Sequence, residues 1–338
     1  MMRSGLNAQK ELTVVVTMAS GSSGWEQLCP HPELKVGRCR FLLNPTETCR
    51  ADFWIVFANA RPADAMVCAP ENTLLIVGEP AEKKIYPLQY YRQFFHVVDT
   101  HEGAGHPRCH LHAPCFSWHV GLNHQTAHFD YGYEDLARES PPAHLSDRIS
   151  LVCSEAAHTP GQVEWLHFLE QLKARMGDRI VHFGRGFQPV SDKMEAIRGF
   201  RLHLVLENCQ APHYWTEKLS DAYLGWSFPY YAGCTNLGEY FDPAAFCRVD
   251  LNAADVVAAK ISEHLKTPVS ERESRLVAGA RDRILNVYNP WVQWARWAEQ
   301  LYDPAASPKP ICLRSHKAFR PFPQNLIYRA KSCFTRRE

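Results

Sequence analysis

Two adjacent residues at the predicted start of a helix, Glu217 and Lys218, carry side chains suited to holding a phosphorylated ligand. The first turn of a helix has unpaired backbone N–H groups and the positive end of the helix dipole, so it favours an anion. The Lys218 ammonium adds a positive charge there, and the Glu217 carboxylate can accept hydrogen bonds from two ribose hydroxyls. The alternative is a solvated helix cap. The pair therefore predicts either a nucleotide site or a plain helix start.

Three residues just upstream extend this candidate site. Tyr214, on the preceding loop, can cover a base or a ribose, or donate a hydrogen bond to a phosphate oxygen. Asn208 follows a predicted strand and is expected to point into a cleft beyond the end of that strand. Glu207 either joins the ligand site or orients its neighbours through hydrogen bonds, and the sequence leaves both interpretations open.

A second candidate, Glu79, is suited to removing a proton. It follows an apolar run at 74–77 and precedes Pro80, which places its carboxylate at the edge of a sheet rather than inside it. A general base needs such an exposed carboxylate beside a cleft. The alternative is an acid on a surface turn, and the competing carboxylates are those of Glu71, Glu82 and Asp99.

These residues must be positioned by alternating strands and helices. In the first half, short apolar runs predict strands at 13–18, 53–57, 74–77 and 96–99. A connection rich in proline and charge at 139–147 precedes a second alternating series. The pattern predicts an α/β fold of two facing doubly wound (Rossmann-like) domains, with a ligand cleft at the carboxyl ends of the strands. We expect domains at 1–145 and 146–302, followed by a basic tail at 303–338.

The second half shows the alternation more clearly. Strands are predicted at 149–153, 179–183, 201–206 and 227–231, and helices at 162–176, 193–198, 217–224, 253–266, 270–288 and 290–302. Apolar residues recur at helical spacing in two of these helices. They are Trp165, Leu166, Leu169, Leu172 and Met176 in one helix and Trp291, Trp294 and Trp297 in the other. We interpret both sets as packing residues, the tryptophans as a brace between the two domains.

The segment that carries Glu207 to Lys218 has a recognisable pattern. A strand ends in Leu-Glu-Asn, a Tyr-Trp-Thr-Glu-Lys stretch follows, and a helix with Ala222 leads to a strand that begins near Pro229 and ends near Gly233. This order and spacing resemble the donor-binding signature of the alpha-1,3/1,4-fucosyltransferase family, glycosyltransferase family 10. Leu206 replaces a phenylalanine of that signature. The Gly78-Glu79-Pro80 element also resembles the short family element that carries the proposed base.

The resemblance implies a GT-B type architecture, with an acceptor-binding domain followed by a donor-binding domain. It implies an inverting enzyme that moves L-fucose from GDP-fucose to a glycan hydroxyl, with Glu79 as the base. It assigns the donor to Asn208, Tyr214, Glu217 and Lys218, with Glu207 beside them. We expect no cofactor and no metal requirement, because the chain contains no Asp-x-Asp sequence to hold a metal against a diphosphate.

One departure from the family pattern concerns the diphosphate. Bacterial members carry an arginine shortly after the first strand of the donor domain, whereas residues 154–162 here contain none. A histidine or glutamine cannot replace the planar, doubly hydrogen-bonding cation. Arg185, between Gly184 and Gly186, is the best substitute, and its alternative is an ordinary turn cation.

Histidines and cysteines gather between positions 101 and 128. They are His101, His106, Cys109, His110, His112, Cys115, His119, His124 and His128. Their spacing does not match a zinc site, so we expect no metal there. We interpret the segment as a loop on the acceptor side, with Trp118 or Phe116 as a platform for a sugar ring.

Charge and composition restrict the partners. The 338 residues are 46% hydrophobic and 22% charged with a formal net charge of +1, which gives no reason to expect a nucleic-acid partner. Twelve cysteines without an evident secretion signal favour reduced thiols and a cytoplasmic location. Residues 304–338 carry eight Lys or Arg and one acid, interleaved with aromatic residues. This tail either touches an anionic inner-membrane surface or is a solvated extension that packs some aromatics on the body.

The sequence thus predicts an inverting glycosyltransferase, with a GDP-sugar as donor and a free or lipid-linked glycan as acceptor. Two alternatives stay open. One is a transferase that uses another nucleotide sugar, and the other is a catalytically silent glycan- or nucleotide-binding protein with the same fold.

Overall fold

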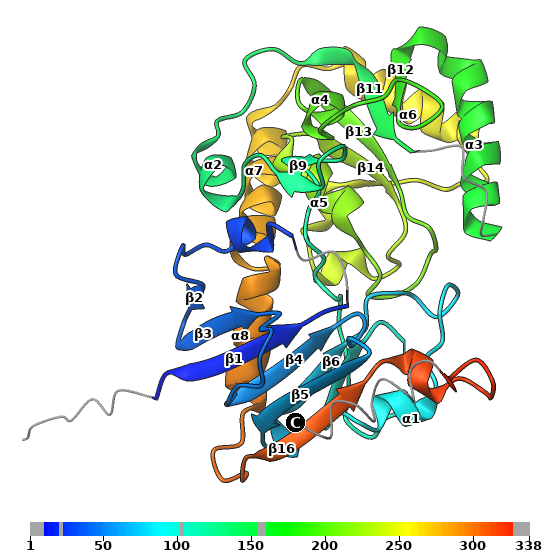
Figure 1. Ribbon diagram of the computed structural model, residues 1–338. Coiled ribbons are helices and arrows are strands. Elements are labelled where there is room, and N and C mark those ends of the chain that lie inside the picture. The colour runs from blue at the N-terminus through cyan, green and yellow to red at the C-terminus, as the bar shows by residue number, and fades with distance from the viewer. Residues whose placement is uncertain (1–9, 20–22, 102–104, 154–159, 327–338) are drawn as a thin grey trace, which may run out of the picture.

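Two parallel β-sheets organise the chain, and the lower and upper halves of Figure 1 each contain one. The computed structural model describes residues 10–19, 23–101, 105–153 and 160–326. The first sheet has the order β2-β3-β1-β4-β6-β7-β8, and every neighbouring pair is parallel except β2 and β3. Its strands are β1 (Leu12–Thr17), β2 (Lys35–Val36), β3 (Cys39–Leu43), β4 (Phe53–Phe57), β6 (Thr73–Ile76), β7 (His96–Asp99) and β8 (Cys109–Leu111).

The second sheet is entirely parallel, in the order β12-β11-β13-β14-β15. Its strands are β11 (Ser146–Val152), β12 (Ile180–Phe183), β13 (Phe200–Leu206), β14 (Phe228–Ala232) and β15 (Cys247–Arg248). β13 is buried along its whole length, as expected for a central strand covered on both faces.

Helices cover both faces of this second sheet. The side chains of α3 (Pro160–Met176) and α6 (Ala254–Lys266) pack in one apolar cluster on one face. On the other face lie α4 (Met194–Ile197), α5 (Glu217–Leu224) and α7 (Glu271–Asn286). The apolar stripe of α3 lies in the core, as predicted. The doubly wound arrangement is therefore confirmed in this half.

The first sheet is covered differently on its two faces. One face packs against α8 (Pro290–Leu301), whose Trp294 stacks on Trp25. The other face carries α1 (Leu88–Tyr91) and a two-stranded antiparallel layer of β5 (Ala63–Cys68) and β16 (Lys309–Arg314). β5 forms this layer because every second side chain along it is buried. A strand layer thus replaces the crossover helix that a Rossmann unit would place between β4 and β6.

The last quarter of the chain corrects the expected domain limits. Trp291 and Trp294 of α8 are fully buried against Phe41 and Phe57 of the first sheet, so α8 belongs to the first domain. The segment expected as a tail from residue 303 begins with β16, which pairs with β5 over six residues. The tryptophan stripe packs as predicted: its ring contacts are on the first sheet, and it belongs to an apolar core that also contains residues of the second domain.

Several short elements complete the described chain. They are α2 (Tyr133–Arg138), the hairpin β9 (Leu122–Asn123) with β10 (His128–Phe129), and six 3-10 helices, η1 (Trp25–Leu28), η2 (Pro70–Asn72), η4 (Gly177–Arg179), η5 (Leu237–Glu239), η6 (Pro243–Ala245) and η7 (His316–Phe319). Among the described residues, no helix combines the length and the apolar character that crossing a bilayer requires.

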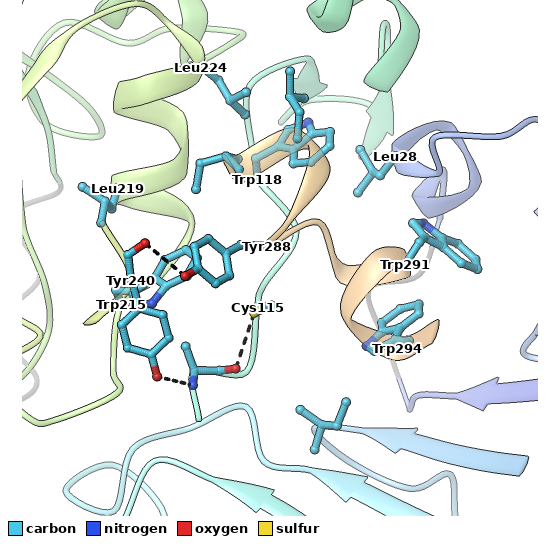
Figure 2. Close-up of a cluster of buried hydrophobic side chains, with 14 of the residues drawn as sticks. Leu28, Cys115, Trp118, Trp215, Leu219, Leu224, Tyr240, Tyr288, Trp291 and Trp294 are labelled. Carbon is cyan, nitrogen blue, oxygen red and sulfur yellow. Dashed lines mark hydrogen bonds between the residues drawn. The ribbon is translucent and has the colours of Figure 1, made fainter. Parts of the chain in front are cut away.

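One apolar core joins the two domains. Figure 2 shows side chains of α5 and α8 in this core, with Trp118, Trp215 and Tyr288 between them. The Tyr240 hydroxyl accepts a hydrogen bond of 3.0 Å from the backbone N–H of Ala113, and so ties the second domain to the segment after β8. The domains therefore meet through packed side chains as well as through two chain crossings.

Candidate functional site

A buried carboxylate, that of Glu207, holds the start of α5 at the carboxyl end of β13. Glu207 Oε1 accepts a hydrogen bond of 2.8 Å from the Thr216 backbone N–H, and its Oε2 accepts one of 2.7 Å from the Thr216 hydroxyl. Thr216 is the N-cap of α5, and its hydroxyl in turn accepts a bond of 3.4 Å from the Lys218 backbone N–H. A side chain at Gly233 would lie 2.4 Å from Cγ of Glu207, so only glycine fits beside this carboxylate. Glu207 therefore orients its neighbours.

The Lys218 ammonium lies between two carboxylates. Its Nζ is 3.3 Å from Glu207 Oε2 and 3.8 Å from Glu217 Oε1, and the side chain is 24% exposed. Burial lowers the pKa of Lys218, but the charges of Glu217 and Glu207 raise it more, so its pKa lies above the usual range. Burial raises the pKa of Glu217, yet Lys218, His119 and Lys193 lower it further, so that pKa lies well below the usual range. Both side chains are therefore charged at neutral pH.

A second lysine, Lys193, reaches the same helix from the N-cap of α4. Its Nζ lies 2.9 Å from Oδ2 of the buried Asp221 and 3.9 Å from Oε1 of Glu217. Asp221 Oδ1 also accepts hydrogen bonds from the backbone N–H groups of His119 and Val120, at 2.7 and 3.1 Å. Sequence reasoning assigned no role to Lys193, Asp221 or His119, although Lys193 matched the family pattern.

Tyr214 and the loop after β13 face the first domain. Burial raises the pKa of Tyr214 above its usual range, and the carboxylates of Glu207 and Glu79 contribute to this shift. Burial, followed by the Glu82 carboxylate, raises the pKa of the Cys209 thiol to about 12, and the thiol hydrogen-bonds to that carboxylate. The loop at 79–82 of the first domain therefore lies opposite the predicted donor residues. Asn208 lies on the loop after β13, and its backbone oxygen touches the start of α3 at Gly161.

Glu79 is placed as the sequence predicts, just past the carboxyl end of β6. Its side chain is 31% exposed, and its Oε1 lies 2.8 Å from the ammonium of Lys83. Of its competitors, Glu71 belongs to η2, which precedes β6 and therefore lies at the opposite edge of the sheet. Asp99 is fully buried. Glu82 remains at the cleft, on the same loop as Glu79.

Arg185, the expected substitute for the family arginine, is exposed on a turn after β12. β12 is the edge strand and lies one place further out in the sheet than β11. The Ser154–Thr159 stretch, which lacks the family arginine, lies outside the described residues. Lys173, in the last turn of α3, lies beside β12, next to His182. Burial raises the pKa of the Cys153 thiol, just past the end of β11, to about 12, and the charges of Lys173 and Lys218 both lower it.

A hydrogen-bonded chain holds Lys173 in place. Its Nζ lies 2.5 Å from Nδ1 of His182, whose Nε2 lies 2.9 Å from Sγ of Cys153. Burial and the Lys173 charge lower the pKa of His182 to about 4, so the ring is neutral and accepts from the ammonium at Nδ1. Lys173 is a cation at this sheet edge that sequence reasoning missed, because helical spacing gives no sign of where a helix ends relative to a sheet.

The predicted acceptor platform is wrong for one of its two residues. Trp118 is 1% exposed and belongs to the interdomain core, because its segment folds over α5 (Figure 2). Phe116 is half-buried against Phe57 and lies beside Gly78, near the loop that carries Glu79. Across the described part of the chain, the histidines and cysteines of this region form no group of three metal-binding side chains.

Comparison with known proteins finds solved structures that are similar to this chain. No family model and no curated protein matches the chain. A crystal structure of alpha1,3-fucosyltransferase has 15% sequence identity and a TM-score of 0.48, over 90% of this chain and 94% of that one. A GDP complex of alpha1,3-fucosyltransferase has 16% identity and a TM-score of 0.44, over 86% of this chain and 95% of that one. A trehalose-6-phosphate synthase structure has 11% identity and a TM-score of 0.44, over 76% and 75%.

The described residues place a positive charge, that of Lys218, in the second domain and a carboxylate, that of Glu79, in the first domain near Tyr214. The α5 cluster contains two lysines, Lys193 and Lys218, and three carboxylates, those of Glu207, Glu217 and Asp221. A diphosphate bound there would need further positive charge beside Lys218. Lys173 is a candidate, because its charge and that of Lys218 both act on Cys153.

Proposed function

We propose that the chain is an inverting glycosyltransferase that moves a sugar from a GDP-sugar, with GDP-L-fucose as the preferred donor, to a glycan hydroxyl. The observation that carries the proposal is the placement of Lys218 and Glu217, anchored by Glu207, on the opposite side of the cleft from Glu79. Transfer between two substrates requires this separation of an anion site from a base.

The reaction follows as a direct displacement. The acceptor oxygen attacks the anomeric carbon, its proton passes to Glu79, and the bond from that carbon to the diphosphate oxygen breaks with its electron pair. Lys218 and Lys173 stabilise the charge that develops on the leaving diphosphate, in a partly buried site where such contacts are strong. Glu217 accepts hydrogen bonds from the ribose, and Tyr214 packs beside the nucleoside.

We propose that no metal ion is needed, because lysines neutralise the leaving group and the sequence contains no Asp-x-Asp. Activity should therefore survive complete chelation with EDTA. A loss of activity that Mg²⁺ or Mn²⁺ restores would contradict this part of the proposal.

A nucleotide panel separates the proposal from its two alternatives. Thermal unfolding is measured with GDP, UDP, ADP and CMP, with Lys218→Ala as the matched variant. The proposal expects GDP to stabilise the wild-type protein most and the variant little, and donor turnover to accompany binding. A preference for UDP supports a different nucleotide sugar. GDP binding without release of GDP from GDP-fucose, across galactose- and N-acetylglucosamine-terminated oligosaccharides, supports a silent binding protein.

A finer proposal concerns the membrane. Ile85 and Phe322 are 75% and 74% exposed, more than any other large apolar side chain that the structure describes. Lys84 precedes Ile85 in the chain, and Lys317 and Arg320 precede Phe322. The charges of Lys317 and Arg320 lower the pKa of Lys84, which burial lowers most, so these cations lie near one another. Apolar side chains surrounded by cations fit an anionic bilayer surface. We propose that this patch, beside the loop that carries Glu79, rests on such a surface and brings lipid-linked acceptors to the cleft.

A further inference from the structure

A histidine held by a buried aspartate lies at the carboxyl end of β7. Asp99 is fully buried, and its Oδ1 lies 2.9 Å from Nδ1 of His101. The same Oδ1 accepts a hydrogen bond of 2.7 Å from the Thr100 backbone N–H, and Oδ2 accepts one of 2.9 Å from the Tyr91 hydroxyl. Three donors therefore fix the carboxylate, and the carboxylate fixes the ring.

This contact determines which nitrogen of His101 carries the proton. An ionised carboxylate can only accept hydrogen bonds, so the hydrogen of the neutral ring lies on Nδ1. Nε2 is then an acceptor. The His101 side chain is 26% exposed, so a ligand can approach the ring. The arrangement presents a fixed hydrogen-bond acceptor at the edge of the first sheet.

His101 and Glu79 each come just past the carboxyl end of one of two neighbouring strands. β6 and β7 are parallel with Ile76 opposite Val98, and a hydrogen bond of 2.9 Å from Val77 N–H to the Val98 carbonyl continues the ladder. Because the two strands run in the same direction, both residues lie at the same edge of the first sheet.

Other titratable groups surround the pair. Burial raises the pKa of Tyr86 above its usual range, and both Glu79 and Asp99 contribute, which places the two carboxylates near one hydroxyl. Burial also raises the pKa of Tyr91, with contributions from Asp99, Tyr86 and, on β8, Cys109. Lys83 is paired with Glu79.

We propose that His101, oriented by Asp99, binds the acceptor sugar by accepting a hydrogen bond from one of its hydroxyls at Nε2. The proposal rests on the proposed function, because it takes Glu79 as the residue that marks the acceptor side. His101 is then a specificity-determining residue that selects acceptors with a hydroxyl at that place, while Glu79 removes the proton from the attacking hydroxyl.

The test is acceptor KM at pH 7.5, with GDP-fucose as donor and an oligosaccharide that the wild-type enzyme glycosylates. His101→Ala should raise acceptor KM at pH 7.5 roughly 3- to 10-fold, the effect of one lost hydrogen bond. Its kcat and donor KM should change less than about twofold if His101 makes no contact special to the transition state.

His101→Gln is the decisive variant. Its side-chain amide can accept a hydrogen bond, so acceptor KM should stay near the wild-type value at pH 7.5, whereas it should rise in His101→Ala. His144→Ala, in the exposed connection between the domains, is the control. An unchanged acceptor KM in His101→Ala, or the same rise in His101→Gln as in His101→Ala, overturns the proposal. No transfer by wild type on any acceptor contradicts the proposed function and this inference together, whereas the variant results bear on His101 alone.

Discussion

The Lys218 ammonium lies 3.3 Å from Oε2 of Glu207, the carboxylate that also receives both hydrogen bonds from Thr216. The buried side chain of Glu207 thus positions both Thr216, the N-cap of α5, and the ammonium of Lys218. The ammonium has three donors, and its two carboxylate neighbours leave capacity for a ligand oxygen. Donor binding should therefore depend on Lys218 strongly, and on its position as much as its charge.

Lys218→Ala should weaken GDP binding by roughly 10- to 150-fold, corresponding to the loss of a charge-assisted contact of about 1.5 to 3 kcal/mol. Isothermal titration calorimetry measures the affinity, and the exposed Lys260→Ala is the control. Because the change also leaves Glu207 without a partner, unfolding by urea is measured on the same preparation. Unchanged GDP affinity in a folded variant would place the donor elsewhere.

Lys173→Ala tests whether this lysine replaces the arginine that bacterial members of the family carry and that residues 154–162 here lack. Its ammonium is held by His182 beside Cys153, so its loss should weaken GDP binding roughly 5- to 50-fold and guanosine binding hardly at all. The difference between the two ligands isolates the phosphate contact. Arg185→Ala, measured in parallel, should have the smaller effect because Arg185 is exposed one strand further out. The reverse order would restore Arg185 as the substitute.

Glu79→Gln should lower kcat by roughly 10² to 10⁴ and leave GDP affinity nearly intact, because glutamine keeps the shape of the side chain and loses the base. Donor turnover with a working acceptor is the measurement. Glu82→Gln is the matched control on the same loop. A Glu79 variant that retains more than about a tenth of wild-type kcat would transfer the role to Glu82.

The double change Ile85→Ser with Phe322→Ser should reduce binding to phosphatidylglycerol vesicles at least about tenfold, since both apolar side chains leave the bilayer surface. Co-sedimentation measures the bound fraction, at low salt and again at about 0.5 M NaCl, where the contribution of the cations is screened. Val163→Ser with Val256→Ser, at 55% and 53% exposure on the second domain, is the control. The proposal that this patch rests on an anionic surface is contradicted if the two double variants bind the vesicles equally. It is also contradicted if the wild-type protein binds neutral phosphatidylcholine vesicles as well as anionic ones.

Stability in acid should depend on Glu273. Burial raises the pKa of Glu273, but hydrogen bonds and charges from Arg201 and His264 lower it more, to about 2, from an ordinary value of 4.5. The folded state therefore binds this proton more weakly than the unfolded chain does. Its contribution to the free energy of unfolding, on the order of 3 kcal/mol, should be present above about pH 4.5 and be lost as the pH falls toward 2. Urea unfolding between pH 2.5 and 6 measures it.

Glu273→Gln should flatten this acid dependence, and Glu271→Gln, at 92% side-chain exposure, should leave it unchanged. If both variants lose stability with pH as the wild type does, other carboxylates govern the acid transition.

The second domain could be predicted from the sequence almost element by element. The helix expected at 217–224 coincides with α5, and the predicted strand at 201–206 differs from β13 by one residue. Apolar runs of this kind report burial on both faces of a parallel sheet. The first domain was harder, because β5 alternates in burial and pairs with a strand more than 240 residues away, and no local pattern contains its partner.

The candidate site was predictable where chemistry coincides with a local signal. Glu79 and Lys218 each follow from the end of a strand or the start of a helix. Trp118 was misplaced because an aromatic residue in a polar loop looks the same in sequence whether it faces a cleft or a core. Lys173 escaped notice, and His101 was noted only as one of a run of histidines, because their positions depend on contacts with His182 and Asp99 that only the assembled sheets create.

The pairing of β16 with β5 affects the order in which the chain can fold during its synthesis. The first sheet needs α8 on one face and β16 on the other, and both are synthesised after the whole second domain. Until then, apolar surface at Trp54 and Phe41 lacks its final cover, whereas the second domain is supplied with its own helices on both faces. The domain made first is therefore completed last, and a nascent chain would hold an unfinished first domain beside the second.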